Sequence, residues 1–100
     1  MIENETIVAL ATPQGIGAIG VIRLSGPASI SITSAVFTKD LSKEESHTAH
    51  FGRIKDKARV VDEVLVTIFA TGRSYTGEEV VEISCHGSQY ILQDVIRLLT

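Results

Sequence analysis

The segment at residues 80–86 is the part of this 100-residue chain that most constrains its fold. It reads Val-Val-Glu-Ile-Ser-Cys-His, so a strand places Glu82 and His86 on one face and Ile83 and Cys85 on the other. A carboxylate in the middle of a strand is costly unless it is solvated or paired. We therefore expect a half-buried strand whose second face meets either water or a partner that needs an anion.

The rest of the chain repeats this pattern of short strands. We expect strands at residues 6–11, 19–25, 50–54, 60–70 and 80–85, a helix opened by Gly26-Pro27 and a helix from Ser88. The first helix is expected to bury Ala28, Ile32, Ala35 and Val36. The polar segment 38–48 is expected to be an exposed loop. Consecutive strands with only two helices favour an α+β fold with a mixed, folded five-stranded sheet over a doubly wound one.

Composition and charge exclude several classes of protein. A net charge of −3 gives no basic face for nucleic acid, and the acidic start does not resemble a signal peptide. The longest apolar run, residues 64–70, is too short to cross a bilayer. A single cysteine rules out an internal disulfide, so we expect a cytoplasmic protein. The last helix carries a broad apolar stripe and no stop signal, which suggests one domain, residues 1–100, of a longer protein.

One of the two common nucleotide-binding patterns occurs in the chain. Residues 15–20 match G-x-G-x-x-G, but a dinucleotide site needs a helix there, and residues 21–24 have the pattern of a strand. We interpret the segment as a glycine-rich turn. No P-loop pattern occurs in the chain, and no cluster of nucleophile, base and orienting group is visible. The sequence therefore predicts no catalytic site in these 100 residues.

Two adjacent pairs offer reactive side chains. Asp62 and Glu63 point to opposite faces of a strand, so they cannot share a proton, and a solvated strand edge is expected for them. Cys85 and His86 also diverge, which argues against a shared metal site. We expect Cys85 to pack on the apolar face as a small hydrophobic residue.

Arg23 and Glu82 are each the lone charge inside an otherwise apolar strand, and their charges are opposite. One interpretation is a structural ion pair between strands. The other is a shared ligand pocket, because a carboxylate accepts two adjacent N–H groups and a guanidinium suits carbonyl or carboxylate groups. The pattern leaves both interpretations open.

Several segments together resemble one known family, the tRNA modification GTPases called MnmE or TrmE. The matching stretches are Thr-Ile-Val-Ala at 6–9, Ala-Thr-Pro at 11–13, Arg23 with Ser-Gly at 25–26, His-Phe-Gly at 50–52, Asp-Glu-Val at 62–64, Ser-Tyr-Thr-Gly-Glu at 74–78, Glu82 and His-Gly at 86–87. The chain departs from the family pattern at Gln14, Ile16, Ala18 and Ser88. The resemblance covers essentially the whole chain.

This resemblance implies a fold and a function. The family's N-terminal domain is similar to the folate-binding domain of aminomethyltransferases; it binds a one-carbon tetrahydrofolate (5-formyl- or 5,10-methylene-tetrahydrofolate) and forms a homodimer. Arg23 and Glu82 match the family's folate contacts, and a further lysine contact of the family lies beyond Thr100. The full protein adds a GTPase domain that uses GTP, K⁺ and Mg²⁺, and with the flavoprotein MnmG it modifies the wobble uridine of tRNA. The alternative expectation is a pure dimerisation scaffold in which Arg23 and Glu82 only pair with each other.

Overall fold

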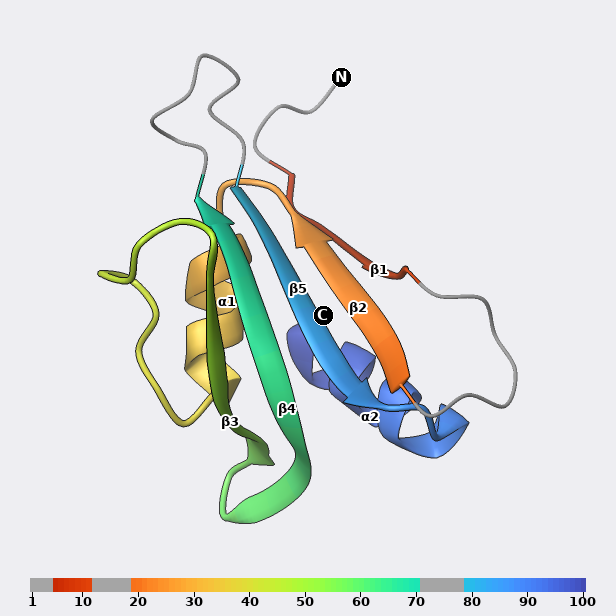
Figure 1. Ribbon diagram of the computed structural model, residues 1–100. Helices are drawn as coiled ribbons and strands as arrows, with labels where there is room; N and C mark the ends of the chain where they lie inside the picture. The colour runs from red at the N-terminus through yellow and green to blue at the C-terminus, as the bar shows by residue number, and fades with distance from the viewer. Residues whose placement is uncertain (1–4, 12–18, 71–78) are drawn as a thin grey trace.

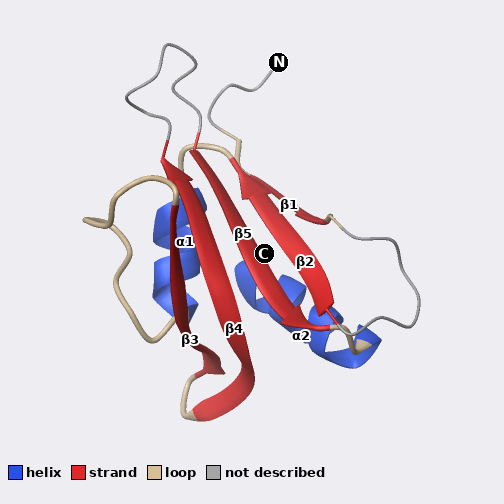
Figure 2. Cartoon of the chain, in the orientation of Figure 1, coloured by secondary structure: helices blue, strands red, loops and turns tan. Residues whose placement is uncertain are grey.

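A computed structural model of the chain describes residues 5–11, 19–70 and 79–100. This part contains five strands and two helices (Figure 2). They are β1 (Ile7–Leu10), β2 (Ile19–Ser25), α1 (Ser29–Val36), β3 (Thr48–Asp56), β4 (Arg59–Ala70), β5 (Glu79–His86) and α2 (Gln89–Leu99). The predicted α+β class and element order are confirmed, and most boundaries agree within two residues.

The five strands form one sheet in the order β1-β2-β5-β4-β3. All four ladders are antiparallel, so the expectation of a mixed sheet is wrong. The connection through α1 carries the chain from β2 to the far edge strand, β3. The meander β3-β4-β5 then returns across the sheet, and β5 arrives beside β2 running in the opposite direction.

Both helices lie on the same side of the sheet, behind it in the view of Figure 1. The buried core lies between them and the sheet. Its strand residues are Ile22, Leu24, Ile54, Val64, Val66, Ile68, Val81, Ile83 and Cys85. These alternate along their strands with residues of the other face, which no helix covers within the described part of the chain. We call that other side the open face.

Helix α2 confirms the prediction of a helix from Ser88 with a broad apolar stripe. The Ser88 hydroxyl caps it by accepting a hydrogen bond from the Ile91 N–H at 3.4 Å. Leu92 and Val95 are buried against the sheet. A Cβ built on Gly20 of β2 would lie 2.7 Å from both Cδ atoms of Leu92. The absence of a side chain at Gly20 therefore lets α2 pack closely on β2.

The buried side of α1 agrees with the expected one at Ile32 and Val36, which pack against the core, and differs at other positions. Ala35 is exposed, whereas Ser29 and Thr33 are fully buried. Burial of these hydroxyls carries little cost because both are hydrogen-bonded: Ser29 Oγ donates to the Gly26 carbonyl at 2.8 Å and Thr33 Oγ1 to the Ser29 carbonyl at 2.9 Å. An apolar pattern therefore misses the two polar residues that this helix buries completely.

The segment between α1 and β3 was expected to be an exposed loop, and that is wrong at one residue. Leu41 is completely buried in the core, and its N–H donates to Ser34 Oγ at 3.1 Å. A single apolar residue in a polar segment has no periodicity that would reveal it. Leu41 fastens the loop to α1.

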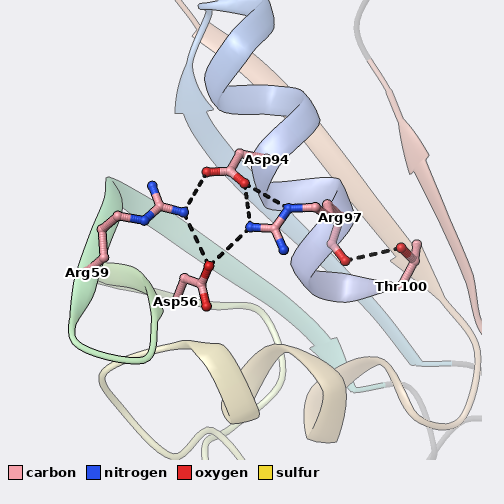
Figure 3. A network of polar contacts seen from close by, with 5 residues as sticks. All are labelled: Asp56, Arg59, Asp94, Arg97 and Thr100. Atoms are coloured by element: carbon pink, nitrogen blue, oxygen red, sulfur yellow. Dashed lines mark hydrogen bonds and ion pairs between the residues drawn. The ribbon is translucent and has the colours of Figure 1, made fainter.

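Four charged side chains join the β3–β4 turn to α2 (Figure 3). Arg59 contacts Asp56 at 3.3 Å and Asp94 at 3.0 Å, and Arg97 contacts the same two carboxylates at 3.1 and 2.7 Å. Hydrogen bonds from Arg97 and then Arg59 hold the pKa of both Asp56 and Asp94 below its usual value. This network connects one end of the long hairpin to the helix layer.

The first part of the predicted glycine-rich turn, at residues 15–18, and the family-like stretch at residues 74–78 lie outside the described residues. The strand β2, which begins at Ile19, agrees with the interpretation that a strand and not a helix follows the glycine pattern. No helix in the described part of the chain is long and apolar enough to cross a membrane.

Candidate ligand-binding face

The open face combines apolar side chains with a central pair of charges. Ile7, Ile19, Phe51 and Leu65 are all exposed large hydrophobic residues. They come from four different strands, and Phe51 and Leu65 are direct cross-strand partners. A sheet face with several exposed apolar residues is typical of a surface that contacts a ligand or another protein.

Arg23 and Glu82 lie opposite each other in the β2–β5 ladder. Arg23 Nη2 is 2.6 Å and Nε 2.9 Å from Glu82 Oε2. The side chain of Arg23 is 51% exposed and that of Glu82 27% exposed. The sequence expectation that the two lone strand charges converge is confirmed, and they meet by direct contact.

The contact leaves part of each group available. Both Arg23 nitrogens approach the same carboxylate oxygen, and no hydrogen bond within the described residues uses Glu82 Oε1. The second terminal nitrogen, Nη1 of Arg23, also makes no hydrogen bond within the described part of the chain. The pair therefore offers acceptor and donor groups side by side to a molecule on the open face.

A second polar pair, which the sequence did not predict, lies further along β5. Asp62 Oδ1 is 2.6 Å from His86 Nδ1, and Asp62 Oδ2 accepts the His86 backbone N–H at 2.8 Å. The β4–β5 ladder ends at Leu65 and Ser84. Beyond that rung, the Asp62 carboxylate replaces the backbone acceptor that a continued ladder would supply.

This arrangement corrects the expectation of a solvated Asp62. Its side chain is 6% exposed, while that of His86 is 68% exposed. Asp62 is buried because His86 satisfies both of its oxygens. Asp62 and His86 are 24 positions apart, and no motif connects them. Only the pairing of β4 with β5 brings them together.

Cys85 packs in the core as predicted, 2% exposed. Burial first, and the nearby Asp62 carboxylate second, raise the pKa of its thiol to about 12. Its exposed neighbour His86 lies against Asp62 instead, so Cys85 and His86 do not form a common site. Within the described residues, no three potential metal ligands gather.

Hollows lie on both sides of the sheet in the described part of the chain. One, of about 300 Å³, lies on the open face and includes Ile19, Phe51, Leu65, Ser84 and His86 in its lining. The other, of about 370 Å³, lies beside α1 on the opposite side of the sheet, and neither Arg23 nor Glu82 lines it. Neither Arg23 nor Glu82 lines the hollow on the open face either, but Ser84 and His86, which do, follow Glu82 along β5.

Comparison with known protein families identifies the family of this chain. Residues 6–100 match the model of the family described as GTP-binding protein TrmE N-terminus. The chain belongs to this family. The resemblance expected from the sequence is thus confirmed.

Curated relatives of the family are close in sequence. The tRNA modification GTPase MnmE of Cytophaga hutchinsonii is 57% identical over 97 residues, which are 96% of this chain and 21% of the relative. MnmE of Flavobacterium psychrophilum is 56% identical over 103 residues, 99% of this chain and 22% of the relative. That of Bacteroides thetaiotaomicron is 54% identical over 101 residues, 96% and 22%. The chain spans about a fifth of the length of these relatives.

Proposed function

We propose that this domain binds a one-carbon tetrahydrofolate on its open face and forms a homodimer, as part of a tRNA modification GTPase. In this proposal Glu82 accepts the adjacent N–H groups of the pterin ring, and Arg23 contacts a carbonyl or carboxylate of the same ligand. GTP, K⁺ and Mg²⁺ belong to the GTPase domain of the longer protein. The partner flavoprotein MnmG and the wobble uridine of tRNA are likewise contacted by the assembled protein, in the cytoplasm.

The arrangement of Arg23 and Glu82 carries this proposal. The two groups are neighbours in the ladder, are partly exposed and use only one carboxylate oxygen for their mutual contact. A ligand with a pair of ring N–H donors matches the oxygen that remains. The exposed hydrophobic residues of the open face suit contact with the faces of a planar ring.

The second candidate function is a dimerisation scaffold. In it Arg23 and Glu82 bind no ligand and only pair with each other. The scaffold is favoured by the exposed apolar side chains of the open face. The two functions differ in one measurable respect, since only the first predicts that the charges are needed for folate binding.

Titration calorimetry of the full-length protein with 5-formyltetrahydrofolate tests the proposal. Glu82→Gln should weaken binding by about 2–4 kcal/mol, because a hydrogen-bonded charge is lost from the contact. Glu44→Gln is the matched control: Glu44 also pairs with a cation, Lys39, at 3.7 Å, and is 32% exposed. Equal affinities for wild type and Glu82→Gln would remove Glu82 from the site. A dimer in sedimentation with no heat from folate would favour the scaffold.

A further inference from the structure

His86 is held in a fixed orientation although most of its ring is exposed. Asp62 contacts both its backbone N–H and its ring nitrogen Nδ1, and the carboxylate itself is buried. An ionised carboxylate only accepts hydrogen bonds, so Nδ1 carries the proton of that contact. The other ring nitrogen, Nε2, therefore points away from Asp62.

The anchored ring lies at the rim of the hollow on the open face. Ser84 and His86 line this hollow together with the exposed side chains of Ile19, Phe51 and Leu65. Along β5 the open face thus presents Glu82, then Ser84, then His86. Glu82 and His86 are four positions apart in β5, which corresponds to roughly 13 Å along the strand. The exposed side chains of Leu65 and Phe51 lie in the row of Ser84, between the rows of Glu82 and His86.

We propose that His86 is a second ligand contact, which binds the aminobenzoyl-glutamate part of the folate whose ring lies at Glu82. This inference rests on the proposed function. A folate has a polar bicyclic head, an aryl ring and a polar aminoacyl end. On the open face Glu82 comes first, then the row that holds Leu65 and Phe51 beside Ser84, then His86. The aryl ring covers the exposed Phe51 and Leu65 in the hollow, and His86 Nε2, which carries no proton when Nδ1 does, accepts a hydrogen bond from the amide N–H of the aminoacyl end.

The role of Asp62 follows from the same geometry. It does not touch the ligand; it is a positioning residue that keeps the His86 ring at the rim. An imidazole without this anchor would lose rotamer freedom on binding, and the contact would be weaker.

The test compares two ligands on wild type, His86→Ala and His86→Phe. The first ligand is 5-formyltetrahydrofolate, and the second is 6-methyltetrahydropterin, which keeps the ring N–H groups but lacks the aminobenzoyl-glutamate part. We expect both His86 variants to weaken folate binding about five- to tenfold and to leave tetrahydropterin binding within about twofold. His86→Phe keeps the ring volume, so its loss reports on the polar nitrogen. Thermal unfolding of each variant checks that the fold is retained.

The other outcomes separate this inference from the proposed function. If wild type binds folate and the His86 variants bind it equally well, or lose both ligands in equal measure, His86 is not the distal contact, and the function proposed for Glu82 stands. If the full-length wild-type protein, which includes the lysine expected beyond Thr100, binds neither ligand, the proposed function and this inference both fail. Glu82→Gln, measured alongside, should lose both ligands.

Discussion

Removing the charges of Arg23 and Glu82 should change stability little, even though the pair is short. At 2.6 Å, two unit charges attract by about 1.6 kcal/mol at the dielectric constant of water. The Arg23 side chain is half exposed, so solvent and salt screen the pair, and ordering two long side chains opposes it further. We expect a net coupling of about 0.5 kcal/mol, and below about 1 kcal/mol.

A double-mutant cycle measures this coupling directly. Arg23→Gln, Glu82→Gln and the double variant are unfolded in urea and followed by circular dichroism, and the free energies of unfolding are combined. The cross-strand pair Arg53–Glu63, on the same face at 3.7 Å and more than half exposed on both sides, provides a control cycle. Both cycles should give small values.

A large coupling would refute this reasoning. If the Arg23–Glu82 cycle gave about 2 kcal/mol or more without ligand, the pair would be a structural clamp of the kind found in buried sites. Arg23 and Glu82 would then resist separation by a ligand, and the scaffold function would be favoured. A small coupling together with a large loss of folate affinity in Glu82→Gln would assign the pair to binding.

Three further predictions follow from the packing and the charges. Gly20→Ala should destabilise the fold by about 1–2 kcal/mol, because the new Cβ meets Leu92 Cδ atoms at 2.7 Å, and urea unfolding should show that Leu92→Ala removes most of this cost. The Cys85 thiol, whose pKa burial raises to about 12, should react with a disulfide reagent at pH 8 far more slowly in the native state than in urea; equal rates would contradict its burial. The lowered pKa of Asp94, caused first by Arg97, contributes stability that is fully present above its ordinary value of 3.8 and is lost as the pH falls through the lowered value. As the pH falls below about 4, thermal unfolding of Arg97→Gln should therefore show a smaller loss of stability than that of wild type. The same loss in both proteins would show that the network does not cause the acid sensitivity.

The sequence determined the elements of this fold because alternation and helical periodicity are local properties. The strand at Glu79–His86 and the capped helix after Ser88 follow from residues within a few positions of each other. Alternation along the same strand also predicted that Glu82 and Cys85 lie on opposite faces. The two lone charges of opposite sign also indicated a pair, since an isolated charge in a strand needs compensation.

Tertiary structure decided what depends on distant partners. The order of the strands put β5 between β2 and β4, and this made Arg23 a direct neighbour of Glu82. It also buried Asp62 against His86, although 24 positions separate them. The direction of a ladder and the satisfaction of a buried carboxylate are set by contacts between residues far apart in the chain, which no local pattern encodes.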